Sequence, residues 1–80
     1  MPRMRRCSGP TLVALLKPLG FVVERQRGSH MKLVRRLPSG RQTLIIPNHG
    51  MLDTGTIRAI AHQAANYLTD EEIRIVFYTE

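Results

Sequence analysis

The sequence has few aromatic residues and no tryptophan. Its 80 residues include two Phe and two Tyr, so a core must be built mainly from Leu, Ile, Val and Ala. Hydrophobic residues make up 42% of the chain and charged residues 22%, which is typical of a globular protein. A chain of this length supports one modest core and excludes a deep, enclosed cavity for a small molecule. We therefore expect residues 1–80 to form a single domain.

Cysteine and long apolar runs are equally scarce. The single Cys7 excludes an internal disulfide, and without clustered Cys and His ligands a structural zinc site has no support. The apolar stretch that follows the basic N-terminus is interrupted by Lys17, Pro18 and Gly20, which excludes a secretory signal core and a membrane span. These features predict a cytoplasmic protein with no membrane partner.

Acidic residues are rare in the first half of the chain. Residues 1–41 contain ten Lys and Arg but only one acid, Glu24, and the whole chain has a net charge of +6. Clustered arginines in a basic domain favour a phosphate-rich partner such as a nucleic acid, although they also serve solubility or dock an acidic protein. The first half is therefore the expected anion-facing half.

Hydrophobic spacing predicts two helices that flank three strands. The first helix begins near Ser8 and ends at Gly20, with Pro18 distorting its last turn, and its apolar stripe is Leu12, Leu15, Leu16 and Leu19. Strands are predicted over 21–26, 30–37 and 42–46. The second helix begins at Thr54, and its apolar positions are Ile57, Ile60, Ala61, Ala64 and Leu68. Residues Thr54–Thr56 at its start either cap the helix in the ordinary way or offer backbone N–H groups that bind a phosphate.

The last residues, 69–80, carry a mixed signal. Thr69 followed by Asp70, Glu71 and Glu72 has the form of a helix-capping box, whereas the residues after it are β-branched and aromatic. We expect a short third helix here, as an addition to a core that spans about residues 9–68.

The α-β-β-β-α order predicts an α+β fold of the double-stranded RNA-binding-domain type. Such a fold has a three-stranded antiparallel sheet with two helices on one face and the other face open. Alternation along strand 30–37 directs Met31, Leu33 and Leu37 toward the core. The open face then carries His30, Lys32, Val34 and Arg36.

Short motifs in a fixed order identify a family resemblance. They lie in "LLKPLGFVVERQRGSHMKLVRR", "IIPNHG" and "TGTIRAIAHQA", and over about residues 11–66 the chain resembles the HicA, or YcfA-like, toxins. The shared features are a Leu-Gly-Phe step, a Gly-Ser-His run, a Pro-x-His run after the third strand, and a helix that begins at a Gly-Thr pair. Pro18, Met31 and Asp53 depart from the family pattern, and these departures bear on substrate preference and RNA affinity.

The resemblance implies the toxin of a type II toxin–antitoxin system, an mRNA interferase that a HicB-type antitoxin inhibits. It also implies that the histidine of Gly-Ser-His, here His30, is catalytic. Cleavage of an RNA backbone needs a group that moves protons near neutral pH, and imidazole, with an ordinary pKa of about 6.5, suits this task. His49 is a possible second acid or base, or a residue that shapes its turn or contacts the partner.

Cations around His30 are the expected phosphate ligands. Lys32 and Arg36 share its strand face, Arg25 and Arg27 precede it, and Arg35 and Arg41 extend the basic surface. Gly28 and Ser29 either shape the turn or let a phosphate approach the backbone. With Glu24 as the only carboxylate of the basic half, we expect no metal ion and no cofactor.

Two other functions fit the same sequence features. One is a non-catalytic module that binds double-stranded RNA with the same fold, and the other is a protein-interaction module with a basic docking face. Cleavage of RNA that depends on His30 would distinguish the toxin from both of these alternatives.

Overall fold

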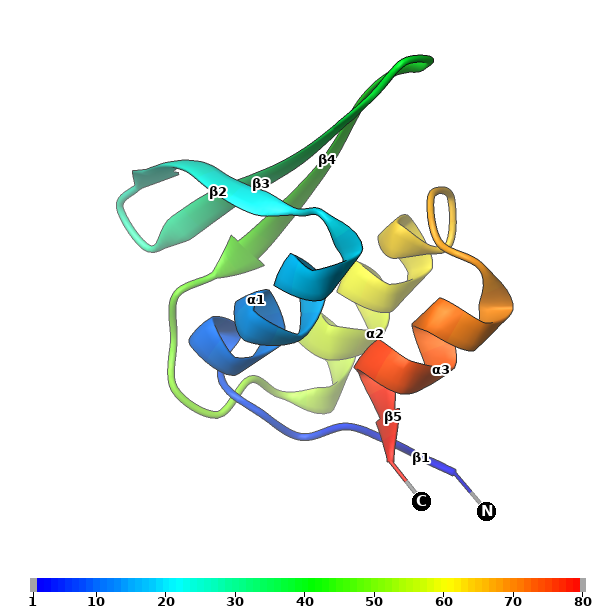
Figure 1. The fold of residues 1–80 in the computed structure, drawn as a ribbon. Coiled ribbons are helices and arrows are strands. Elements are labelled where there is room, and N and C mark those ends of the chain that lie inside the picture. The colour runs from blue at the N-terminus through cyan, green and yellow to red at the C-terminus, as the bar shows by residue number, and fades with distance from the viewer. Residues whose placement is uncertain (1, 80) are drawn as a thin grey trace.

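The three central strands form one antiparallel sheet with the helices gathered on one side of it (Figure 1). The computed structural model describes residues 2–79. The elements in chain order are β1 (Arg3–Met4), α1 (Gly9–Leu16), the 3-10 turn η1 (Lys17–Leu19), β2 (Val22–Arg27), β3 (His30–Leu37), β4 (Gly40–Pro47), α2 (Thr54–Ala64), α3 (Asp70–Phe77) and β5 (Tyr78–Thr79). The predicted α-β-β-β-α arrangement is confirmed, and so is the short C-terminal helix. Among residues 2–79, no helix combines the length and the apolar character that a membrane span requires.

The helical segment made of α1 and η1 begins near Ser8 and ends at Gly20, as the sequence predicts, although α1 itself ends at Leu16. The Ser8 hydroxyl caps it by accepting a hydrogen bond of 3.1 Å from the Thr11 amide. Pro18 has no amide hydrogen to donate, and the chain around it tightens into η1 before Gly20 ends the turn with a φ of 100°. Gly9 is needed for a different reason, because a Cβ there would lie 1.8 Å from the carbonyl oxygen of Pro47. This close approach fixes α1 against the end of β4.

The alternation predicted for β3 holds along the strand, but burial departs from it toward the strand's end. Met31 and Leu33 are buried in the core. Leu37 was expected to be buried as well, but it is 38% exposed because the β3–β4 hairpin extends beyond the helices (Figure 1). Val34 keeps the open-face side that alternation gives it and is not part of the core cluster, yet it is only 1% exposed. It lies on the central strand between Val22 of β2 and Thr43 of β4, so both neighbours shield it.

The C-terminal segment belongs to the core rather than being added to it. Val76 and Phe77 of α3 are buried in the same hydrophobic cluster as the helices and the sheet, so the expected core limit at residue 68 is too early. The Thr69–Glu72 capping box is present, and β5 pairs with β1 in a two-stranded sheet. This pairing, which the sequence did not predict, holds the two ends of the described chain together.

Arg35 is a structural residue and not part of the predicted RNA surface. Its guanidinium donates hydrogen bonds to the Gln42 side chain at 2.8 Å and to the carbonyl oxygens of Leu19 at 3.0 Å and Tyr67 at 3.3 Å. It also lies 4.9 Å from the centre of the Phe21 ring. Alternation accounts for this position, because Arg35 follows Met31 and Leu33 on the helix-facing side of β3.

We expect the Arg35→Ala substitution to lower the free energy of unfolding by about 1–3 kcal/mol, because it leaves partly buried carbonyl groups without their donor. Urea unfolding followed by circular dichroism measures the change. Arg58→Ala, at an exposed position of α2, is the matched control and should cause no comparable loss. Equal stability of the two variants would contradict a structural role for Arg35.

Candidate functional site

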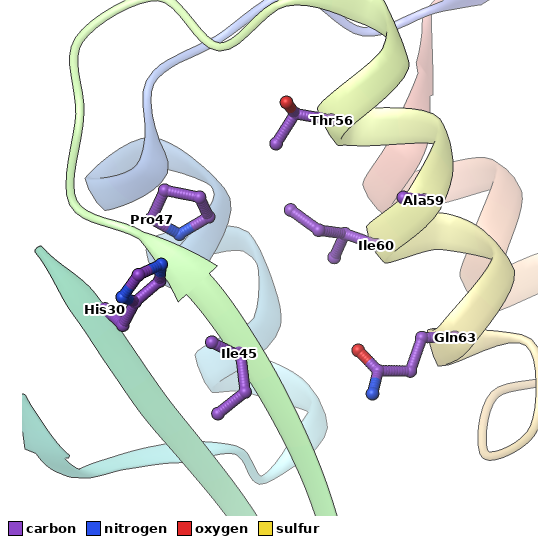
Figure 2. A pocket seen from close by; sticks show the side chains of 7 residues that line it. All are labelled: His30, Ile45, Pro47, Thr56, Ala59, Ile60 and Gln63. Carbon is purple, nitrogen blue, oxygen red and sulfur yellow. The ribbon is translucent and has the colours of Figure 1, made fainter.

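His30 is the first residue of β3, and its side chain is exposed. It pairs in register with Arg27 of β2 and Pro47 of β4. Since Met31 beside it points into the core, His30 points to the opposite face of the sheet. Figure 2 shows its imidazole next to Pro47, at the edge of an open hollow. The histidine singled out from the sequence is therefore accessible to a ligand.

A tight turn places His30 directly opposite Arg27. Gly28 and Ser29 are the only residues between β2 and β3, and Gly28 has a φ of 58°. A positive φ at the first turn position is the pattern of the type II′ hairpin, which favours glycine there. The Ser29 carbonyl accepts a hydrogen bond from the Asn48 amide, which ties this turn to the loop after β4. Both residues therefore have turn-forming roles in the structure.

An irregularity in β2 gathers cations around His30. The register shifts between Val23 and Arg25, so that Glu24 is an extra residue, as in a β-bulge. Without this shift, Glu24 and Gln26 would alternate onto the His30 face and the two arginines would face away. With it, Arg25 lies opposite Lys32 and Arg27 lies opposite His30.

The resulting cationic hollow has a volume of about 170 Å³ and is lined by Arg25, Arg27, His30, Lys32 and Ile45. Four of the residues predicted from the sequence thus meet in one place. Positive side chains around an imidazole attract and hold an anion, because their charges and N–H groups converge on it.

Arg36 lies apart from this hollow, in an ion-pair cluster centred on Glu24. The Glu24 carboxylate is 2.7 Å from Arg36, 3.0 Å from Arg41 and 3.6 Å from Lys32. Arg36 and Arg41 lie directly opposite each other on β3 and β4, so the carboxylate between them offsets their repulsion. Lys32 is shared between this cluster and the cationic hollow.

The charges around Glu24 also change its titration. Partial desolvation raises the pKa of Glu24, but the hydrogen bond from Arg36 and the charges of Arg41, Lys32 and Arg36 outweigh it, so the pKa is lowered. A lowered folded-state pKa means that the carboxylate stabilises the fold above its ordinary pKa. This contribution is lost as the pH falls through the lowered value.

A second, larger hollow begins at His30 and extends to α2. This groove has a volume of about 330 Å³, and its lining residues are His30, Ile45, Pro47, Thr56, Ala59, Ile60 and Gln63 (Figure 2). Helix α2 packs beside β4, one of the two edge strands of the sheet, and the groove lies between them. The groove and the cationic hollow share His30 and Ile45.

The α2 side of the groove was not recognised as part of a site from the sequence. Thr56, Ala59, Ile60 and Gln63 recur at intervals of three and four residues, which places them along one helix face. That spacing was a usable signal. The spacing predicts a core stripe through Ile60, which is indeed only 5% exposed, and it does not by itself indicate a role for the polar neighbours.

Two other sequence candidates lie outside both hollows. His49 is exposed in the loop after β4 and borders neither hollow that contains His30. Its backbone carbonyl accepts a hydrogen bond of 3.0 Å from the Gly9 amide, which gives it a place in the loop structure. The structure thus brings Arg25, Arg27 and Lys32 to His30, but not Arg36 or His49.

The start of α2 is capped by the protein itself. The Asp53 carboxylate accepts a hydrogen bond of 2.7 Å from the Thr56 amide, so ordinary capping describes the Thr54–Thr56 segment. Hydrogen bonds from the Thr56 backbone and side chain, and from Gly55, lower the pKa of Asp53 against a smaller effect of desolvation. The cap therefore stabilises the fold above the ordinary carboxyl pKa and weakens as the pH falls through the lowered one.

The fold and its exposed, basic sheet face define a small α+β protein of the double-stranded RNA-binding-domain-like class. The chain belongs to the HicA toxin family of bacterial toxin–antitoxin systems, whose family model matches residues 9–65. This match covers α1, the three-stranded sheet and α2, and it confirms the resemblance drawn from the sequence motifs. A comparison with curated proteins found no match.

Proposed function

We propose that the protein is a toxin that cleaves messenger RNA, with His30 as general acid or base and without a metal ion. The observation that carries this proposal is the position of His30, which is exposed on the open sheet face and borders a hollow with Arg25, Arg27 and Lys32. Membership of the HicA toxin family supports the toxin role.

The chemistry requires an RNA phosphate in the cationic hollow. Arg25, Arg27 and Lys32 offset the charge that develops on the phosphate oxygens as the 2′-hydroxyl oxygen attacks phosphorus. The 2′-hydroxyl loses a proton as its oxygen bonds to phosphorus, and the 5′-oxygen gains one as its bond to phosphorus breaks. We assign one of these two proton transfers to His30 and the other to water, because His49 does not border the hollow.

The partner and compartment follow from the same proposal. A toxin of this family pairs with an antitoxin, and we propose that a HicB-type protein inhibits this one. Its substrate, messenger RNA, places its action in the cytoplasm.

The direct test incubates RNA with the purified protein and with its His30→Ala variant. Cleavage by the first and not by the second supports the proposal. RNA that is bound but left intact by both proteins identifies a non-catalytic RNA binder instead. The absence of RNA binding even at low salt points to a protein-interaction module.

Replacing Glu24 with glutamine is expected to tighten RNA binding severalfold at low salt. The carboxylate now competes with RNA phosphates for Lys32, Arg36 and Arg41, and its removal frees these cations. Fluorescence anisotropy with a labelled 2′-O-methyl RNA, which has no attacking hydroxyl, measures affinity without cleavage. The gain should shrink as salt is raised.

Glu71→Gln provides the matched control for this measurement. Glu71 is paired with Arg74 on α3, so its replacement changes the net charge equally but leaves the Glu24 cluster intact. Equal gains for the two variants would show that only net charge matters, and no gain for Glu24→Gln would rule out competition by this carboxylate.

A further inference from the structure

The groove between β4 and α2 has the chemical character of a site for a flat, mostly apolar group. Ile45, Pro47, Ala59 and Ile60 contribute apolar surface to it. Ile45 is 40% exposed although it lies on the sheet beside His30. Apolar walls with a small number of polar groups are typical of ligand sites, and the volume of about 330 Å³ lies at the lower end of their range.

The polar groups of the groove lie on α2. Figure 2 shows the Gln63 side chain extending from α2 toward Ile45, with Thr56 near the other end of the same helix face. Within residues 2–79 the Gln63 side-chain amide has no hydrogen-bond partner. An amide presents a donor and an acceptor side by side, which is the pattern that reads the edge of a nucleobase.

The groove and the cationic hollow meet at His30 and Ile45. The β2 side of His30 is therefore positively charged, and the α2 side is apolar with one amide. A nucleotide has the complementary division, because its phosphate is anionic and its base is flat and largely apolar with a polar edge. A phosphate in the cationic hollow brings the base of the same or the next nucleotide to the groove.

We infer that the groove binds one nucleobase of the RNA strand that is cleaved at His30, and that Gln63 is a specificity-determining residue that reads the edge of this base. The inference rests on the proposed function, since it places the base by reference to the reacting phosphate. It adds a base-selective subsite next to the cleaved bond, so that cleavage depends on the identity of one nucleotide there.

The experiment uses short single-stranded RNAs that are identical except for one nucleotide next to the cleaved bond. The intact protein should discriminate among the four bases at this position, as judged from kcat/KM. Gln63→Ala and Gln63→Leu should lower this discrimination by about tenfold, which lies within the range that a bidentate contact to a base edge contributes. Both variants should still cleave, since Gln63 does not border the cationic hollow.

Two further variants separate the groove from general effects on α2. Ala59 is exposed, so Ala59→Phe should fill the groove without disturbing the core, and it should lower kcat/KM for every RNA of the set. His62 precedes Gln63 in the chain but borders a different hollow. The His62→Ala substitution should therefore leave discrimination unchanged. Unchanged discrimination in both Gln63 variants would overturn the inference while cleavage itself upholds the proposed function.

A binding measurement tests the groove independently of cleavage. With a 2′-O-methyl form of the same RNA, NMR signals of the Gln63 side-chain amide and of the Ile45 and Ile60 methyl groups should shift on titration. These shifts without any cleavage of ordinary RNA would uphold the base site and contradict the nuclease. Shifts confined to residues of the cationic hollow, or shifts only with an apolar peptide, would overturn the base site.

Discussion

Replacing His30 with alanine is expected to lower the rate constant for RNA cleavage by about 10²- to 10⁴-fold, the contribution that a positioned acid or base makes to such a step. The loss should fall on the cleavage rate more than on RNA affinity, because Arg25, Arg27 and Lys32 of the cationic hollow remain. Single-turnover cleavage of an end-labelled RNA measures the rate, and anisotropy with 2′-O-methyl RNA measures the affinity.

His49→Ala is the matched control for this prediction. His49 is also an exposed histidine, but it borders neither hollow at His30, so its replacement should change the rate by less than about tenfold. Cleavage that persists in EDTA supports the metal-independent part of the proposal. Equal rates for the protein and its His30→Ala variant would contradict a catalytic role for His30, and a large loss in His49→Ala would restore that residue as the second acid or base.

Replacing Phe77 with alanine is expected to destabilise the fold by about 3–5 kcal/mol, as is usual for a large aromatic side chain removed from a core. Phe77 is 0% exposed and packs in the hydrophobic cluster shared by the helices and the sheet. Since small domains have a total stability of about 5–15 kcal/mol, this loss would remove a large share of the stability of the protein. Urea and thermal unfolding measure it.

Ile75→Ala tests whether the loss comes from burial rather than from α3 itself. Ile75 lies on the same helix but is 54% exposed, so its replacement should cost far less than that of Phe77. A small effect of Phe77→Ala, similar to that of Ile75→Ala, would mean that residues 69–79 are an addition to the fold. A large difference would establish α3 as part of the core.

The elements of this fold were predictable because their signals are local. Ser8 and Thr69 mark helix starts because their hydroxyl groups accept hydrogen bonds from the amides three residues further on, and both caps are present. The range of β3 matched its prediction because Gly28-Ser29 and Pro38-Ser39 are recognisable turns. The exposure of Leu37 and Val34 differs from the prediction. Burial at these positions depends on how far the helices extend over the sheet and on which side chains of the neighbouring strands lie beside them.

The site was predictable only in part, because some of its contacts join residues that are far apart in the sequence. His30 was identified by its motif and by strand alternation, and both depend on residues close to it in sequence. The sequence indicates an isolated acid at Glu24, whereas Glu24 pairs with Arg36 and Arg41. It likewise indicates a surface cation at Arg35, which is instead bound to carbonyl groups of the fold. These roles depend on cross-strand partners that are not adjacent in the chain.

By itself, the sequence determined the order of the elements, the family, and the exposure of His30 at the start of a strand. Only the tertiary structure decided which side chains surround it. The one-residue shift at Glu24 brings Arg25 and Arg27 to the His30 face, and the packing of α2 beside β4 places Gln63 across the groove from His30. The physical reason is that side chains alternate along a strand, so a single extra residue exchanges the two faces.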